Sequence, residues 1–200
     1  MRILTLQNTG RIYTSQVYLV LGSASRLADI NTLVDVGQDP AVLASIGRAP
    51  TGLGKWPVEQ VVLTHGHSDH CALLPMVREA FHPVVYAFCP NIAGVDMALP
   101  DGHKLRMGDE DFEVIHTPGH SSDSICLYNH AEGVLFAGDS PLLITSPTGT
   151  YEDGFLSALE RLCALDVQRI YFGHGAPLTE RCNQRLRESQ RMAMAGMVSR

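Results

Sequence analysis

The sequence predicts a layered domain in which strands and helices alternate. The chain has 200 residues, which is enough for one domain with a sizeable core and leaves little room for a second. Apolar residues make up 45% of the chain and charged residues 18%, a balance typical of a globular protein. Its apolar runs form two similar halves, each rich in strands first and ending in a strand–helix–strand pattern. These observations predict an α/β or α+β fold without deciding the order of its strands.

The first half is expected to combine strands with two helices. The stretch 39–47 is predicted to be a short helix, with Asp39 as its cap and Pro40 at its first position. A second helix is expected after residue 70, where apolar side chains recur at helical spacing, with Ser68 or Asp69 as its cap. Apolar runs predict strands over residues 2–7, 16–21, 32–37, 60–64 and 84–87.

The second half begins with a stretch, 88–101, that is expected to be irregular because proline and glycine interrupt it. The pair Gly108-Asp109 predicts a turn between two strands. A helix is expected over 152–165, where leucine and phenylalanine side chains lie on one side, and a terminal helix over 178–196. The strands expected here cover residues 103–107, 111–116, 124–128, 133–137 and 168–172.

One short loop concentrates residues that bind metals. It follows the apolar run that ends at Leu63, and four strong metal-ligating side chains lie within it: His65, His67, Asp69 and His70. Burying a histidine usually costs solvation, and a surface rarely gathers three histidines around one aspartate. The loop is therefore predicted to be the first half of a metal site.

Three further candidate ligands each follow an apolar run and lie next to a glycine: His120, Asp139 and His174. The strand fixes the position of such a residue, and the glycine permits a sharp turn and a close approach of the backbone. We therefore expect the ligands to converge at one edge of the sheets. Five histidines and two aspartates are enough for two metals with three private ligands each and one shared carboxylate. Sites that keep open positions are typical of catalysis.

These motifs, in this order, resemble those of the metallo-β-lactamase superfamily. The resemblance rests on His-x-His-x-Asp-His at residues 65–70, then Pro118-Gly119-His120, Gly138-Asp139 and Gly173-His174-Gly175, with Leu33-Val34-Asp35-Val36-Gly37 upstream. It implies an α+β fold, a four-layer αββα sandwich formed as a single domain by residues 1–200, with the site at one edge of the two sheets. Asp35 would either hold the loop or a ligand histidine in place, or form a turn.

The resemblance also implies a role for each candidate ligand. It places His65, His67 and His120 on a first metal, Asp69, His70 and His174 on a second, and Asp139 between both. Zinc is expected first, because the shell has imidazoles and carboxylates but no thiolate, and iron or manganese also fit. No residue is assigned to an organic cofactor.

The expected activity is that of a metal-dependent hydrolase. A metal-bound hydroxide would attack a small ester, thioester or lactone, while Asp69 orients it and carries its proton. The summed charge of metals, carboxylates and hydroxide is positive, which favours a small substrate with an anionic group. Three alternatives stay open: an iron-dependent persulfide dioxygenase, a nucleotide phosphodiesterase, and a metal-binding module without catalysis.

Partners and location follow from charge and cysteine usage. The net charge of −6 argues against a polymeric nucleic acid as partner, and no membrane segment or secretory signal is expected. The five cysteines form no CxxC motif, which predicts free thiols in a reducing cytoplasm. Methionines 192, 194 and 197 suggest helix packing or a homodimer contact.

A few residues outside the ligand set carry weaker predictions. Tyr13 and Arg11 lie in a loop, 8–15, that would overhang the metals and contact substrate, and Tyr151 is a similar candidate. His116 is expected to belong to a strand rather than to the ligands, and Cys71 to be a small buried helix residue. The segment after His174 is long enough for one helix, so we do not expect the helical substrate domain of glyoxalase II-type enzymes.

Overall fold

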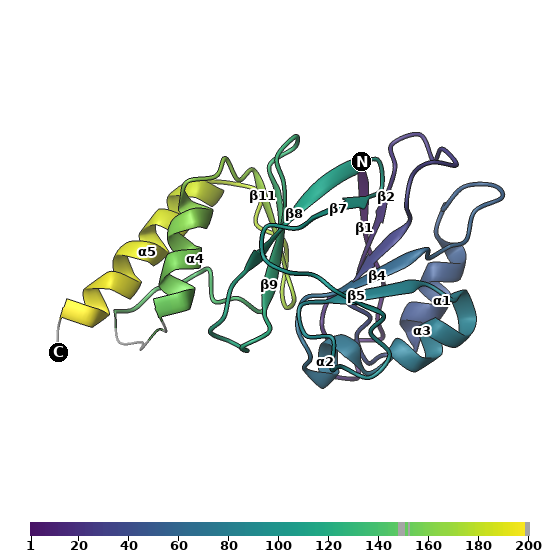
Figure 1. The fold of residues 1–200 in the computed structure, drawn as a ribbon, viewed down its shortest axis with the longest axis horizontal. Helices are drawn as coiled ribbons and strands as arrows, with labels where there is room; N and C mark the ends of the chain where they lie inside the picture. Colours follow the sequence, from purple (N-terminus) through teal and green to yellow (C-terminus); the bar gives the residue numbers. More distant parts are fainter. Residues whose placement is uncertain (148–150, 152, 199–200) are drawn as a thin grey trace.

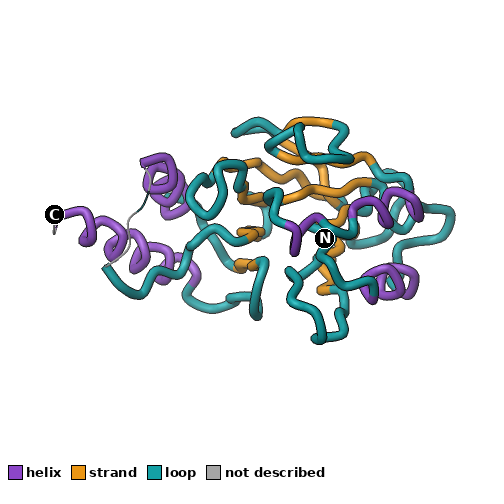
Figure 2. Tube along the Cα trace, turned by 90° about the horizontal axis from the view of Figure 1, so that it is seen from below, coloured by secondary structure: helices purple, strands orange, loops and turns teal. Residues whose placement is uncertain are grey.

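Four layers of secondary structure make up the molecule. In the computed structural model, which describes residues 1–147, 151 and 153–198, two β-sheets lie face to face in the middle (Figure 1). Helices α1 (Ala41–Arg48) and α3 (Leu74–Phe81) cover the outer face of one sheet, and α4 (Asp153–Cys163) and α5 (Cys182–Val198) cover the outer face of the other (Figure 1). Figure 2, viewed from the edge at the bottom of Figure 1, shows the strands between these two groups of helices. The predicted αββα sandwich is confirmed.

The first sheet, here called the N-terminal sheet, takes its strands in chain order. Strands β1, β2 and β3 pair antiparallel, whereas β3, β4, β5 and β6 pair in parallel. Strands β3 and β4 are buried on both faces, as their continuous apolar runs require, whereas β5 is buried only in part and β6 is exposed. The strands are β1 Arg2–Thr5, β2 Tyr18–Leu21, β3 Thr32–Val34, β4 Gln60–Leu63, β5 Val84–Ala87 and β6 Met97–Ala98.

The second sheet, here called the C-terminal sheet, has the order β11-β10-β9-β8-β7. Strand β9 pairs antiparallel with both β8 and β10, and β10 pairs parallel with β11. Strands β8, β10 and β11 therefore run in one direction, and their carboxyl ends lie at the same edge. The strands are β7 Lys104–Met107, β8 Glu110–His116, β9 Ile125–Asn129, β10 Val134–Gly138 and β11 Arg169–Phe172.

The helices differ from the prediction mainly at their starts. Pro40 occupies the N-cap position of α1, and the Asp39 carboxylate accepts a hydrogen bond from the Ala41 N–H. The helix after the metal loop is split into a short α2 and a longer α3, with a proline in the first turn of α3. The prediction that Ser68 or Asp69 caps this helix is wrong, because no side chain caps α2. The helices are α1 Ala41–Arg48, α2 Ser68–Cys71, α3 Leu74–Phe81, α4 Asp153–Cys163 and α5 Cys182–Val198.

Three apolar interfaces hold the layers together, one between each pair of neighbours. Consecutive residues of a strand face opposite sides of its sheet. Accordingly Val61 packs toward the helices and Val62 toward the opposite sheet. In the C-terminal sheet, Leu135 packs toward the helices and Phe136 toward the opposite sheet. At about 25 cal/mol per Å² of apolar area removed from water, these interfaces supply the main favourable term in folding.

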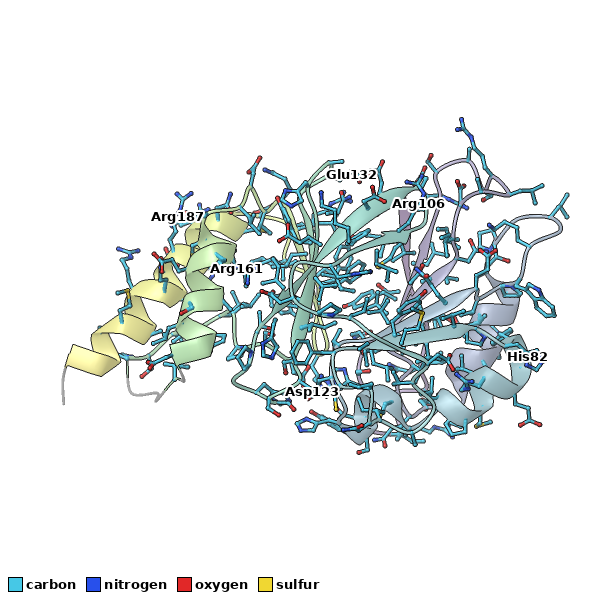
Figure 3. The ribbon with its side chains drawn as sticks, in the orientation of Figure 1. His82, Arg106, Asp123, Glu132, Arg161 and Arg187 are labelled. Atoms are coloured by element: carbon cyan, nitrogen blue, oxygen red, sulfur yellow. The ribbon has the colours of Figure 1, made fainter. Side chains whose placement is uncertain are left out.

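Two other segments differ from the predicted pattern. Strand β6 lies within the stretch 88–101, which was expected to be irregular, and α5 begins at Cys182 rather than at residue 178. Arg161 of α4, labelled in Figure 3, forms an ion pair with Asp101 at 2.9 Å and so links this helix to the turn that precedes β7. Among the described residues, no helix is long and apolar enough to cross a membrane.

Candidate metal centre

The carboxyl ends of five strands meet at one edge of the sandwich. Strands β3 and β4 of the N-terminal sheet end there, and so do β8, β10 and β11 of the C-terminal sheet. The two sheets are joined at this edge by a hydrogen bond from the Ile125 N–H to the Thr64 carbonyl, at 2.9 Å. Asp123, labelled in Figure 3, lies at this lower edge, on which Figure 1 also shows α2. The loops that follow these strands carry the predicted ligands.

His65, His67 and His120 form the first group of ligand side chains. One nitrogen from each ring lies within 4.8 Å of the other two. The His120 Nε2 and His67 Nδ1 atoms are 2.9 Å apart, and the ring of His65 lies 4.6 Å from that of His67. His65 is buried, whereas His67 and His120 are exposed. The group therefore faces solvent on one side.

Asp69, His70, Asp139 and His174 form the second group, and their ligand atoms also lie within 4.8 Å of one another. His174 Nε2 is 3.0 Å from Asp69 Oδ2, and His70 Nε2 is 3.3 Å from Asp139 Oδ1. Helix α2 supplies Asp69 and His70, whereas Asp139 and His174 follow β10 and β11. Both sheets thus contribute to this group.

The Asp139 carboxylate lies between the two groups. Its Oδ2 atom is 3.5 Å from His120 Nε2 in the first group and 3.4 Å from His174 Nε2 in the second. Only 15% of this side chain is exposed, so the carboxylate is held at the junction. The structure brings all seven predicted residues together, and their binding of metals stays a prediction.

The side chains at the centre fit a divalent metal. The Nε2 atom of His65 is buried and makes no hydrogen bond among the described residues, whereas that of His70 lies 3.3 Å from the Asp139 carboxylate. Leaving a buried polar atom without a partner costs about 1–3 kcal/mol, and a metal ion would supply that partner. Imidazole nitrogens and carboxylate oxygens suit zinc, iron and manganese alike. The donor set therefore accommodates a metal without choosing among these three.

Two glycines act as predicted at the ends of β10 and β11. Gly138 has a φ of +49°, and a Cβ there would lie 2.6 Å from Thr64 Oγ1. A Cβ at Gly173 would lie 2.1 Å from Asp139 Oδ1 and 2.6 Å from His70 Cε1. Any larger residue at position 173 would displace two candidate ligands.

Asp35 holds the metal loop from beneath. Its buried carboxylate accepts hydrogen bonds from the Thr64 N–H at 2.8 Å, from the Thr64 hydroxyl at 2.9 Å and from His70 Nδ1 at 2.8 Å. Its φ is +58°, but the backbone forms no turn at residue 35, so the structure supports the first of the two interpretations, that Asp35 holds the loop and a ligand histidine in place. Sequence reasoning missed the role of Thr64, whose hydroxyl also lies 3.2 Å from His65 Nδ1.

Burial and neighbouring charges separate the pKa values of the two buried histidines in the metal-free protein. Burial, and to a smaller extent the nearby His70, lowers the pKa of His65 to about 4. Burial alone would lower the pKa of His70 as well, but the carboxylates of Asp35 and Asp139 outweigh it and raise that pKa to about 10. His70 therefore carries the proton that a metal would have to displace.

The loop that precedes β2 covers the second group. The Tyr13 ring stacks on the His174 ring with centroids 4.9 Å apart, and its hydroxyl lies 3.3 Å from His174 Nε2. The Ser15 N–H donates to the Asp69 carbonyl, and the Gln16 N–H donates to the Gly173 carbonyl. The predicted overhang is confirmed, and substrate contact by Tyr13 or Arg11 stays a prediction.

An open cleft of about 400 Å³ adjoins the centre. His120, Asp139 and His174 line one side of it. Tyr151 does not line this cleft but packs on Phe155, with ring centroids 5.6 Å apart. The remaining lining comes from the segment after Asp139 and from the end of β11: Gly138, Ser140, Pro141, Leu142, Leu143, Phe172 and Ala176.

Two other candidates lie outside both ligand groups, as predicted. His116 stacks on Phe88 at 4.0 Å and donates from Nε2 to the Ser122 carbonyl. The Cys71 thiol donates to the Gly66 carbonyl, and burial raises its pKa. All five cysteines are free thiols.

Comparison with known families agrees with this arrangement. A model of the metallo-beta-lactamase superfamily matches residues 15–88 and 95–174. The chain belongs to the metallo-beta-lactamase superfamily. A solved metallo-beta-lactamase family protein from Thermus thermophilus superposes with a TM-score of 0.70 at 23% identity, covering 99% of this chain and 80% of that one. This likeness supports the fold alone.

Curated relatives in the metallo-beta-lactamase superfamily match in part. The hydroxyacylglutathione hydrolase of Klebsiella pneumoniae subsp. pneumoniae is 35% identical over 111 residues, covering 54% of this chain and 41% of the relative. The atrochrysone carboxyl ACP thioesterase of Aspergillus fumigatus is 26% identical over 191 residues, covering 87% of this chain and 45% of the relative. This chain spans about half the length of the curated relatives it matches.

Proposed function

We propose that this chain is a metal-dependent hydrolase of thioesters. The observation that carries the proposal is the position of Asp139, whose Oδ2 atom lies 3.5 Å from His120 Nε2 and 3.4 Å from His174 Nε2. A carboxylate so placed suits two ions that share one ligand. Both relatives described above have names that denote hydrolysis of an acyl thioester. The proposal also includes small esters and lactones, which present a similar carbonyl group.

We assign His65, His67 and His120 to one ion, Asp69, His70 and His174 to the other, and Asp139 to both. Zinc is the proposed metal. When bound, divalent ions polarise a carbonyl and lower the pKa of water to about 7. Single-domain organisation over residues 1–200, a reducing cytoplasm as location and a homodimer contact through α5 remain our expectations. Met192 and Met194 are exposed on that helix, whereas the side chain of Met197 lies outside the described residues.

The chain's own groups orient the reactants. Asp69 is the proposed catalytic carboxylate, because its Oδ2 atom lies 3.0 Å from His174 Nε2 at the border of the cleft. From this position it orients the attacking water and accepts its proton. Its backbone is fixed by the hydrogen bond from Ser15, which restricts the directions available to the carboxylate.

The test combines elemental analysis with a thioester assay. Purified protein is expected to hold two zinc ions per chain and to release thiol from a thioester, with loss of activity in chelator. Asp139→Ala is expected to lose metal and to lower kcat/KM at least about 100-fold. Asp111→Ala is the matched control, since this exposed aspartate belongs to neither group and 66% of its side chain is exposed. Full metal content and full rate in Asp139→Ala would refute the shared ligand.

The same measurements separate the alternatives. One iron per chain with oxygen consumption on a persulfide would establish the dioxygenase instead. Hydrolysis of phosphodiesters alone would point to the nucleotide enzyme. Metal binding without turnover of a thioester, ester, lactone, phosphodiester or persulfide would leave a binding module.

A further inference from the structure

The cleft beside the metal centre has an apolar wall. Among the described residues that line it, none is a lysine or an arginine. Pro141, Leu143, Phe172 and Ala176 supply accessible apolar surface, whereas Leu142 is buried beneath them with 1% of its surface exposed. Leu143 is 39% exposed, so a ligand in the cleft can touch its side chain.

This wall is held in place by hydrogen bonds. The Ser140 hydroxyl lies 2.7 Å from the Thr117 hydroxyl, and the Leu142 N–H donates to the Ser140 carbonyl at 2.7 Å. The Phe172 carbonyl accepts a hydrogen bond from the Tyr18 hydroxyl at 2.7 Å. A surface whose backbone is fixed before binding loses little backbone freedom when a ligand arrives.

We propose that the cleft binds the acyl group of the thioester and selects an apolar acyl chain over a charged one. The inference rests on the proposed thioester hydrolysis and adds its substrate class. A carboxylate at the far end of the acyl group would need an arginine or lysine, because desolvating an unpaired charge is costly. An apolar chain gains free energy for each methylene group that the wall removes from water.

The position of the wall favours the acyl side of the substrate over the thiol side. Thiols that carry acyl groups in cells are polar or charged, so the apolar part of such a thioester is its acyl chain. The wall also continues directly from two candidate ligands, since residues 140–143 follow Asp139 and Phe172 precedes Gly173-His174. A carbonyl at the centre therefore places its acyl chain along Leu143 and Phe172.

This selectivity refines the expectation of an anionic substrate. The positive charge expected at the centre acts on the carbonyl oxygen and on the nucleophile. The wall offers no positive charge to a second anionic group further along the acyl chain. In a glutathione thioester of the same acyl group, the carboxylates of glutathione therefore gain no favourable charge interaction at this wall.

The test uses thioesters of one neutral thiol with acetyl, butanoyl, hexanoyl and succinyl groups, and the hexanoyl thioester of glutathione. We expect kcat/KM to rise about two- to fourfold per methylene from acetyl to hexanoyl. The kcat/KM of the succinyl substrate is expected to be at least about tenfold lower than that of the butanoyl substrate. Calorimetry of the products should show tighter binding of hexanoate than of succinate, a readout independent of turnover.

Variants of Leu143 locate the effect. Leu143→Ala should lower kcat/KM for the hexanoyl substrate about five- to tenfold and lower kcat/KM for the acetyl substrate less. Leu143→Lys should raise kcat/KM for the succinyl substrate relative to the hexanoyl substrate, because the lysine adds a cation that can pair with the succinyl carboxylate. Leu53→Ala is the matched control, since Leu53 is 98% exposed and does not line this cleft.

Two kinds of failure are distinguishable. Absence of hydrolysis for every thioester would contradict the proposed function itself. Hydrolysis with a flat dependence on chain length, or with succinyl preferred, would overturn only the apolar acyl site. A Leu143→Lys variant that folds, binds metal and keeps the original order of substrates would also overturn it.

Discussion

Replacing Asp35 by alanine should destabilise the protein before any metal is considered. The buried carboxylate accepts hydrogen bonds from the Thr64 N–H, the Thr64 hydroxyl and His70 Nδ1, at 2.8, 2.9 and 2.8 Å. Alanine leaves the N–H and the ring nitrogen buried without an acceptor. It also has to adopt a φ of +58°, which an aspartate tolerates better.

The magnitude follows from these contacts. Each buried donor without a partner costs about 1–3 kcal/mol, and the left-handed backbone adds about 1 kcal/mol for alanine. Asp35→Ala should therefore lower the free energy of unfolding by about 3–7 kcal/mol. Asp35→Asn keeps the shape of the side chain and should cost about 1–2 kcal/mol. Because it weakens the orientation of His70, Asp35→Asn should also lower metal affinity about 10–100-fold.

The assay is urea unfolding of the chelator-treated protein, followed by far-ultraviolet circular dichroism. Chelation separates the hydrogen-bond effect from the loss of metal binding. Asp111→Ala, with an exposed carboxylate, should change stability by no more than about 0.5 kcal/mol. A loss below about 1 kcal/mol in Asp35→Ala would refute the assigned role of the three hydrogen bonds.

Two further predictions concern close packing and pH. Gly173→Ala should lower metal content and activity sharply, because its Cβ would lie 2.1 Å from Oδ1 of the candidate ligand Asp139; elemental analysis checks this. Gly47→Ala, in α1 with no atom within 4 Å of the added Cβ, should instead raise stability by about 0.5–1 kcal/mol. Burial alone would raise the pKa of Asp109, but hydrogen bonds from the Ser23 hydroxyl and N–H outweigh it and lower that pKa to about 2 from 3.8. This carboxylate therefore stabilises the fold above the unfolded value of 3.8 and loses its contribution as pH falls through about 2. The stability difference between the wild type and Asp109→Asn should shrink over that window, and a constant difference would contradict the assignment.

The candidate ligands were predictable because their signal is local. Each strand–glycine–ligand pattern marks the end of a strand, and strands that run in one direction end at the same edge. His120, Asp139 and His174 therefore meet the loop 65–70 although they are far from it in sequence. The layered fold followed from the family resemblance, because periodicity alone does not order the strands.

Other features depend on contacts that are distant in sequence. The Thr64 hydroxyl acquires its role from Asp35, and no local pattern announces that pair. Strand β6 has two residues, too few for an alternation to appear, and its pairing with β5 defines it. The wall of the cleft lies in the irregular segment 140–143, where apolar residues have no period that reveals what they face.

Because both sheets supply the candidate ligands, the proposed metal loading would depend on the order of synthesis. His65, His67, Asp69 and His70 leave the ribosome early, but neither group contains enough ligands without residues from the C-terminal sheet. The first group is completed by His120 and the second only by His174. A nascent chain thus presents an incomplete set of donors until β11 has been made. We expect full loading to follow docking of the two sheets, so that metal binding selects chains whose halves have already assembled.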